Sequence, residues 1–321
     1  MSEVLLEVTG LKKYFPIKAG FLRKTVGHVK AVDGVSFTIN AGETLGIVGE
    51  SGCGKSTTGR MIMRVLDPTE GQIRFEGRDI ARIPASSLRK LRRDFQMIFQ
   101  DPHSSLNGKM TVRELIAEPF VIHGLVSKTD IDREVCRLLE TVGLREADRF
   151  RHPHEFSGGQ RQRISIARAL ALNPKLIVAD EAVSALDVSI QSQILNLMVE
   201  LKHQYHLSYM FISHNLAVVK HISDRVGVMY LGTMVELAST QSLFRKPLHP
   251  YTEALLSAAP QPKRNVIQER IVLEGDVPSP AKPPSGCPFH TRCPKAFDRC
   301  AIERPALKEV AEGHQVACLL Y

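Results

Sequence analysis

The sequence has no tryptophan and few aromatic residues of any kind, which together fill 6% of its 321 positions. No apolar run approaches the roughly 18 residues that a membrane-spanning helix needs, so we expect no such helix. The first residues, MSEVLLEVTG, lack a basic segment followed by an apolar core and a small-residue cleavage site. This pattern predicts a protein without a secretory signal, located in the cytosol.

Concentrated basic charge is scarce as well, although the net charge is +8. The densest basic cluster, RKLRRDF at 89–95, has no interleaved aromatic residues on which nucleic-acid bases could stack. The simpler interpretation of this cluster is the solvent-exposed face of a helix. We therefore expect no nucleic-acid partner.

A glycine-rich segment, GESGCGKST at 49–57, lies between an apolar strand pattern, TLGIVG, and a helical pattern, TTGRMIMRVL. Gly49, Gly54, Lys55 and Ser56 match the phosphate-loop pattern G-x-x-x-x-G-K-[ST]. Glycines let successive backbone N–H groups converge on phosphate oxygens at the positive end of the following helix. Lys55 can then reach the β- and γ-phosphates and Ser56 can ligate Mg²⁺. The segment predicts a site for a nucleoside triphosphate rather than an ordinary glycine turn.

Two adjacent carboxylates end the buried strand pattern KLIVADE at 175–181. Asp180, at the end of the strand, can hold Mg²⁺ directly or through water, and Glu181 can polarise a water molecule that attacks the γ-phosphate. Alone, the pair could equally be surface acids after a core strand. After a phosphate loop, the catalytic interpretation is favoured.

A second glycine turn, FSGGQRQR at 156–163, opens a strong helical pattern. The start of this helix also suits phosphate. Because the first loop already serves one nucleotide, we expect this turn to face a nucleotide presented by another subunit. The alternative is a plain helix cap.

The remaining pattern is that of an α/β protein. Strands fill 1–48 and 70–77, helices fill about 105–172, and strand, helix and strand patterns follow at 175–180, 189–205 and 208–214. A hairpin is predicted at 225–238. This alternation predicts a parallel sheet covered on both sides, with the helical insertion as a lobe of its own. After about 260 the composition becomes proline-rich, which predicts a linker and then a small loop-rich module.

These motifs resemble those of the ABC ATPases over residues 1 to about 255. SGGQ resembles the signature motif of that family, and SALD at 184–187 resembles its D-loop. Gln100 in IFQDP resembles the glutamine of the Q-loop, and His214 resembles the switch histidine. Phe15 resembles the aromatic residue that stacks on adenine, with Tyr14 as the alternative. The fold implied is a RecA-like core with an antiparallel β-subdomain and a helical subdomain.

The segments IFQDPHSSLN, SALDVSIQ, PLHPYTEALLSAAP and PPSGCPFHTRCP further resemble the ATPase subunits of dipeptide and oligopeptide importers, in particular the F-type subunit. That resemblance implies ATP hydrolysis that drives peptide uptake through two separate membrane permeases fed by an extracytoplasmic solute-binding protein. It also implies pairing with a second, usually non-identical ATPase subunit at the cytoplasmic face of the inner membrane. The domains implied are a nucleotide-binding domain at 1–258 and a C-terminal extension at 259–321.

The resemblance assigns roles to individual residues. The ATP-binding set is Phe15, Gly49, Glu50, Ser51, Gly52, Cys53, Gly54, Lys55, Ser56, Thr57, Gln100, Asp180 and His214. The catalytic set is Glu181, His214 and Gln100, and the Mg²⁺ set is Ser56, Gln100 and Asp180. The partner's ATP would be contacted by Ser157, Gly158, Gly159 and Gln160, and the D-loop is Ser184, Ala185, Leu186 and Asp187.

Two positions depart from the family pattern. Ala182 follows Glu181 where the family has proline, so the rigidity that proline gives this loop is lost. Asn215 follows His214 where the family usually has aspartate, so we expect the histidine to be less well oriented.

Four of the six cysteines, Cys287, Cys293, Cys300 and Cys318, fall within the last 35 residues. Disulfides are not expected in a reducing cytosol. Four thiolates suit either a structural zinc ion or a [4Fe–4S] cluster. The paired C-x₂-C knuckles of zinc ribbons are missing, and the resemblance implies the iron–sulfur site. His290 is a possible substitute ligand, although a surface histidine is the simpler interpretation.

The sequence motifs are also compatible with other functions. The same motor could serve nickel or glutathione instead of peptides. A soluble ABC ATPase acting on ribosomes or DNA commonly has two ATPase domains or a long coiled coil, and neither is present. A non-catalytic regulatory subunit is opposed by the presence of Lys55, Glu181 and His214.

Overall fold

The computed structural model describes residues 3–21, 24–101, 105–258 and 271–321, which divide into two compact units. Unit 1 comprises Asn40–Glu43 and Arg82–Ile212, together with Glu3. Unit 2 comprises Val4–Ile39, Thr44–Ala81 and Ser213–Tyr321. The predicted linker from about 260 lies largely outside the described residues.

An antiparallel sheet of unit 2 has the strand order β2-β1-β4-β5. Its strands are β1 (Val4–Ala19), β2 (Lys24–Asn40), β4 (Glu70–Phe75) and β5 (Arg78–Asp79). Leu6 of β1 lies opposite Phe75 of β4, and both are buried. This sheet corresponds to the strands predicted at 1–48 and 70–77.

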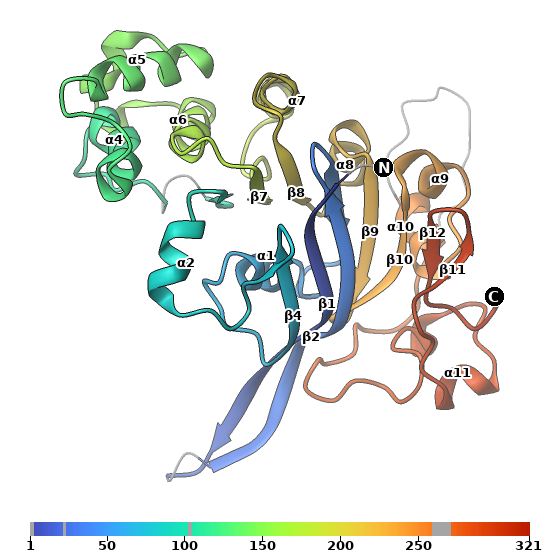
Figure 1. Ribbon diagram of the computed structural model, residues 1–321. Coiled ribbons are helices and arrows are strands. Elements are labelled where there is room, and N and C mark those ends of the chain that lie inside the picture. Colours follow the sequence, from blue (N-terminus) through green and yellow to red (C-terminus); the bar gives the residue numbers. More distant parts are fainter. Residues whose placement is uncertain (1–2, 22–23, 102–104, 259–270) are drawn as a thin grey trace, which may run out of the picture. The chain divides into compact units, whose positions relative to one another are not determined.

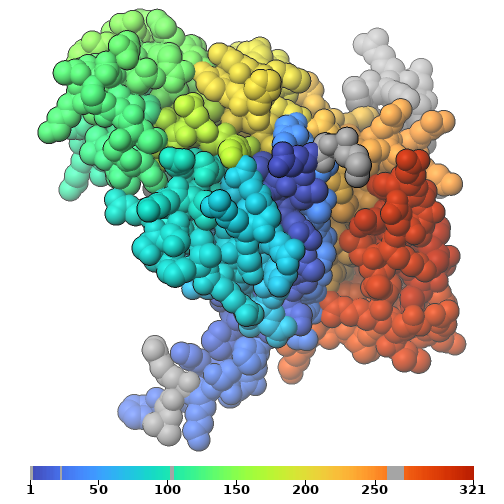
Figure 2. Space-filling model, in the orientation of Figure 1, coloured from blue at the N-terminus to red at the C-terminus, as the bar shows by residue number. Residues whose placement is uncertain are grey.

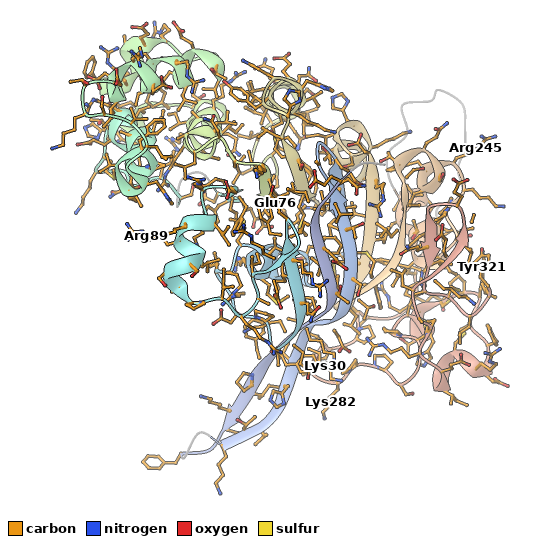
Figure 3. The ribbon with its side chains drawn as sticks, in the orientation of Figure 1. Lys30, Glu76, Arg89, Arg245, Lys282 and Tyr321 are labelled. Atoms are coloured by element: carbon orange, nitrogen blue, oxygen red, sulfur yellow. The ribbon has the colours of Figure 1, made fainter. Side chains whose placement is uncertain are left out.

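The far ends of β1 and β2 form a long two-stranded arm (Figure 1), which projects from the surface in Figure 2. Phe21, beyond the end of β1, is fully exposed. At the base of the arm, the backbone N–H of Lys30 donates to the Pro280 carbonyl over 3.0 Å. Figure 3 shows Lys30 and Lys282 close to one another, so the C-terminal segment passes along this base.

The second set of strands in unit 2 has the order β11-β12-β10-β9-β3. The strands are β3 (Thr44–Val48), β9 (Arg225–Tyr230), β10 (Thr233–Ser239), β11 (Lys308–Ala311) and β12 (His314–Val316). β3 pairs in parallel with β9, and every residue of β3 is buried. β9 and β10 form the antiparallel hairpin that the sequence predicts at 225–238.

Short helices complete unit 2. They are α1 (Lys55–Ile62), α8 (Leu216–Ile222), α9 (Thr240–Arg245), α10 (Pro250–Ala258), the 3₁₀ turn η3 (His290–Arg292) and α11 (Asp298–Ile302). α1 directly follows the glycine-rich loop, as the sequence predicts.

The C-terminal segment is mostly loop over 271–307, and its last strands, β11 and β12, join the sheet of unit 2. β12 pairs with β10, with Val316 opposite Glu236. The Glu236 carboxylate is fully buried and accepts the backbone N–H groups of Leu248 and His249 at 2.8 and 3.0 Å, while His314 Nε2 lies 2.7 Å away. A buried carboxylate needs such partners, so this network fixes the segment to the sheet of unit 2.

Unit 1 has three parallel strands in the order β8-β7-β6. They are β6 (Phe95–Ile98), β7 (Leu176–Asp180) and β8 (Ser208–Ile212), and β7 and β8 are buried along their whole length. The long helix α7 (Val188–Tyr205) connects β7 to β8. This strand, helix and strand order is the predicted one.

A helical lobe makes up the rest of unit 1. Its helices are α2 (Ala85–Leu91), α4 (Val112–His123), α5 (Ile131–Thr141), α6 (Gly158–Leu170) and the 3₁₀ turns η1 (Glu146–Phe150) and η2 (Pro153–Glu155). α4, α5 and α6 pack on one another (Figure 1) and bury an apolar stripe that includes Leu115, Leu138 and Ile164. Their sequence periodicity is therefore correctly read as helical. Among the described helices, none is long and apolar enough to cross a membrane.

Candidate nucleotide site

The glycine-rich loop runs from the end of β3 to the start of α1. Gly49 and Gly54 have φ values of 152° and 101°, where residues with side chains are strained. A Cβ at Gly49 would lie 2.2 Å from the Met229 carbonyl oxygen, and one at Gly54 would lie 2.2 Å from that of Ala31. Only glycine fits these two positions, so the loop backbone is fixed by its surroundings.

Lys55 is buried and turns back over this loop. Its Nζ donates to the carbonyls of Gly49 and Glu50 at 2.8 and 2.9 Å. Gly54 caps α1 without a side chain, so no side-chain oxygen occupies the first N–H groups of the helix. This arrangement presents backbone donors and one ammonium group to an anion.

The other residues of the loop differ in exposure. Ser51 and Gly52 are exposed, Ser56 and Thr57 are half-buried, and Cys53 is buried. Burial raises the pKa of the Cys53 thiol, so it stays a neutral packing residue near neutral pH. The exposed part of the loop is therefore its tip.

In unit 1, Asp180 and Glu181 lie at the end of β7. Asp180 is only 2% exposed. Glu181 adopts a φ of 48°, which is uncommon for a residue with a side chain, and its carboxylate accepts a 2.9 Å hydrogen bond from Nε2 of Gln100. Two residues predicted for the hydrolytic step thus meet within one unit.

The turn at 157–160 closes on itself. The Ser157 hydroxyl accepts the N–H of Gln160 over 3.3 Å, and the Gln160 side chain accepts the N–H of Ser157 over 3.0 Å. This is a capping box at the start of α6. A Cβ at Gly159 would lie 2.4 Å from Ile190 Cγ2, so the turn packs closely on the start of α7.

The segment 184–187 connects β7 to α7 in the same unit. The Ser184 hydroxyl donates to the Glu181 carbonyl over 2.9 Å, and Asp187 caps α7 by accepting the N–H of Ile190 over 3.0 Å. Ala185 is exposed, and Leu186 lies next to Gly158, where an added Cβ would be 3.4 Å from its Cδ2. The predicted D-loop therefore lies beside the predicted signature turn. Ala182, in place of proline, is buried in this connection.

His214 and Asn215 follow β8 and belong to unit 2. Both are exposed. Asn215 caps α8, since its side-chain oxygen accepts the N–H of Ala217 over 3.0 Å and that of Val218 over 3.5 Å. An aspartate would fill the same capping position, so the departure at Asn215 keeps the start of this helix defined.

Phe15 and Tyr14 are the candidates for adenine stacking, and both lie on β1. The Tyr14 hydroxyl donates to the Asp33 carboxylate. The Phe15 ring is partly exposed, with Lys13 Nζ 5.2 Å from its centre. Phe15 therefore presents the more available ring face.

The four C-terminal cysteines lie near one another. Burial raises the pKa of Cys287 to about 11 and the pKa of Cys293 and Cys318 above the usual value, and the neighbouring cysteines raise all three further. The backbone N–H of Cys287 donates to the Cys300 carbonyl over 2.8 Å. Among the residues that the structure describes, however, no three His, Cys, Asp or Glu side chains are grouped closely enough to hold a metal ion.

Two residues that contact the loop were not predicted from the sequence. The Tyr251 hydroxyl accepts the N–H of Glu50 over 2.9 Å, and the Arg292 guanidinium contacts the Glu50 carboxylate at 3.0 and 3.3 Å. They lie 201 and 242 residues from Glu50 in sequence, so no local pattern could have predicted either contact.

Comparison with known proteins agrees with this geometry. Residues 32–184 match the family described as ABC transporter, and residues 235–300 match the C-terminal region of oligopeptide/dipeptide transporters. The chain is 58% identical to the oligopeptide transport ATP-binding protein AppF of Bacillus subtilis, with 100% of this chain and 98% of that protein covered. It is 54% identical to a probable peptide ABC transporter ATP-binding protein of Sinorhizobium fredii, covering 99% and 90%.

Solved structures give the same fold. The dimeric ATP-binding cassette MJ0796, in a post-hydrolysis state bound to ADP and phosphate, superposes with a TM-score of 0.65 at 27% identity, covering 73% of this chain and 98% of that one. The CbiO1 protein of Clostridium perfringens, part of an ABC transporter complex, gives 0.65 at 26% identity, covering 76% and 92%. The predicted P-loop ABC ATPase fold is confirmed, and the chain belongs to the ABC transporter family of ATPases, in its oligopeptide/dipeptide transporter group.

Proposed function

We propose that this chain hydrolyses ATP to power the import of di- or oligopeptides through separate membrane permeases. The observation that carries the proposal is the glycine loop at 49–54, in which Gly49 and Gly54 have no room for a side chain and which leads into a helix start without a side-chain cap. The relatives named above are peptide transport ATP-binding proteins, and this chain matches them over nearly their whole length.

The loop would bind the triphosphate of ATP. Lys55 Nζ now contacts two loop carbonyls, and we propose that it moves to the β- and γ-phosphates, which are stronger partners for an ammonium group. Backbone N–H groups of 49–57, other than that of Glu50, which Tyr251 holds, would take the remaining phosphate oxygens. Phe15 would stack on the adenine.

Ser56 of unit 2, and Asp180 and Gln100 of unit 1, carry the oxygen atoms that Mg²⁺ prefers, and we propose them as its ligands. When bound, Mg²⁺ neutralises phosphate charge. Glu181 would accept a proton from the attacking water. Its contact with Gln100 holds the carboxylate in one orientation, which a general base needs.

Three further groups would complete the reaction. Ser157, Gly158, Gly159 and Gln160 would contact the γ-phosphate of an ATP bound to a partner ATPase subunit. The D-loop beside them would extend toward the same partner. His214 would contact the γ-phosphate of the ATP bound by this chain.

The assembly we propose has this chain, a second and non-identical ATPase subunit, two membrane permeases and an extracytoplasmic solute-binding protein. The chain would lie at the cytoplasmic face of the membrane. We place the nucleotide-binding domain at 1–258 and the extension at 259–321, with no nucleic-acid partner.

We propose further that Cys287, Cys293, Cys300 and Cys318 hold a [4Fe–4S] cluster, with zinc as the alternative. All four thiols act on one another electrostatically without being grouped around one ion. A four-iron cluster gives each iron its own cysteine, whereas a single zinc ion draws four sulfurs to about 2.3 Å from one centre. The choice of the cluster over zinc rests on the resemblance to the peptide-importer subunits and on the lack of paired C-x₂-C knuckles. Iron and sulfide analysis of protein purified without oxygen tests this, and stoichiometric zinc without iron would decide for the alternative.

Transport of labelled solutes into vesicles that contain the whole assembly tests the function. Peptide uptake that needs ATP and stops with Lys55→Ala supports the proposal. Uptake of nickel or glutathione but not of peptides would assign the same motor to another solute. ATP hydrolysis with no transport of any of the three would contradict the transport function.

A further inference from the structure

The C-terminal segment of unit 2 reaches the glycine loop from a part of the chain with no recognised role in nucleotide binding. Arg292, at the end of η3, places Nη1 at 3.3 and 3.0 Å from the two carboxylate oxygens of Glu50, and Nη2 at 3.3 Å from one of them. Nη1 also lies 3.5 Å from the Tyr230 hydroxyl. This two-pronged contact has the geometry in which arginine binds carboxylates most strongly.

The contact is buried at its arginine end and partly exposed at its carboxylate end. The Arg292 side chain is 8% exposed and that of Glu50 is 28% exposed. Burial alone would lower the pKa of Arg292, but its bonds to Glu50 and Tyr230 more than compensate, so the guanidinium stays charged. A partly buried pair is screened by salt less than a surface ion pair, and leaving the Arg292 or Glu50 charge without its partner is costly.

An aromatic cluster holds Arg292 in place. Phe289, three residues earlier, is buried with its ring centre 5.2 Å from that of Tyr230 and 5.3 Å from that of Tyr251. Tyr251 in turn accepts the N–H of Glu50. The backbone and the side chain of Glu50 are therefore both held by groups outside the loop.

Glu50 is the sole acidic residue among 49–57. Its negative charge lies in a loop whose task is to bind a polyanion, so without a partner it would repel the phosphates. In the described part of the chain, the hydrogen bond from Lys55 to Glu50 goes to the backbone carbonyl of Glu50 and not to its carboxylate. Arg292 is the group placed to neutralise this carboxylate.

We propose that Arg292 is a positioning residue of the nucleotide site, which neutralises and fixes Glu50 so that the loop accepts a triphosphate. The inference rests on the proposed binding of ATP by this loop. It gives the C-terminal extension a direct part in nucleotide affinity, in addition to any metal that its cysteines hold.

The test is equilibrium binding of fluorescent ATP and ADP analogues to the full chain and its variants. Arg292→Gln leaves Glu50 unpaired, so ATP affinity should fall about tenfold, and ADP affinity less because ADP carries less charge. The loss should shrink at high salt. Glu50→Gln in the same chain removes the repelling charge, so the double variant should recover most of the lost ATP affinity.

Two variants guard against a merely structural effect. Arg299→Gln breaks an arginine–carboxylate pair with Glu303 that stays inside the C-terminal segment, and it should leave ATP affinity unchanged. Arg292→Lys keeps the charge and should retain more affinity than Arg292→Gln. Thermal unfolding of each variant reports whether the fold is intact.

The outcomes separate this inference from the proposed function. Wild-type affinity in Arg292→Gln, or a loss that Glu50→Gln does not restore, would overturn the positioning role while ATP binding itself stands. No binding of ATP by the wild-type chain would overturn the proposed function and the inference together.

Discussion

The two glycine turns that open helices in this chain, at 49–54 before α1 and at 157–160 before α6, differ in how they treat their backbone donors. The first has a glycine cap in a left-handed conformation and no capping side chain. The second has Ser157 as its cap, with Ser157 and Gln160 satisfying one another's N–H groups. One helix start is therefore open to an anion, and the other is closed by its own side chains.

The difference follows from what surrounds each turn. Gly49 and Gly54 are pinned by backbone carbonyls of β9 and β2, so the first turn keeps its open form without a ligand. The second turn is held by side chains, which can rearrange when a phosphate arrives. We infer that the first binds the chain's own nucleotide and that the second acts only when a partner presents one.

We expect the largest effect on turnover from a substitution that removes the general base and leaves both turns intact. Glu181→Gln should lower ATP turnover by about 10²–10⁴, because the amide cannot accept a proton from water. ATP binding should persist, since neither turn changes. Turnover by the assembled transporter and binding of the ATP analogue measure the two parts, and wild-type turnover would remove Glu181 from the mechanism.

The second turn is broken by Ser157→Arg, whose bulk would exclude a partner's phosphate. Hydrolysis at the partner's site should fall on the order of 10²-fold, as when a transition-state contact is lost. Ser157→Ala is the matched control, since it removes the cap at a cost of about 1 kcal/mol without blocking access. Equal turnover in Ser157→Arg and the wild type would show that the turn has no role in trans.

A smaller effect is expected on stability, where adding a methyl group to a glycine of each turn compares the two backbones. Gly54→Ala forces a Cβ against the Ala31 carbonyl and should destabilise the chain by about 1–3 kcal/mol. Gly158→Ala meets only an ordinary contact with Leu186 and should change stability by less than about 1 kcal/mol. Thermal unfolding of both variants measures the difference, and equal losses would mean that the first turn is not pinned.

The sequence predicts the parts of the site that depend on local pattern. The glycine loop needs particular residues at fixed spacing, and β7 ends at Asp180 because its apolar run ends there. The turn at 157–160 is recognisable for the same reason. These features require only neighbours in the chain, which a single sequence contains.

The C-terminal segment makes contacts that the sequence analysis does not predict. Its composition predicts loops, but β12 also adds to the edge of β10, and Glu236 there contacts His314, which lies 78 residues away in sequence. The Arg292 contact with Glu50 is of the same kind. Such pairings are decided by which edge and which carboxylate the folded chain leaves available, and no local pattern encodes that.

The most direct test of the account is binding of the fluorescent ATP analogue to the isolated full chain, compared between Lys55→Ala and Ser157→Arg. Because the first turn alone should bind this chain's nucleotide, Lys55→Ala should lose at least about tenfold in affinity. Ser157→Arg should bind as tightly as the wild type. Equal losses in both variants, or full affinity in Lys55→Ala, would contradict the assignment of the two turns.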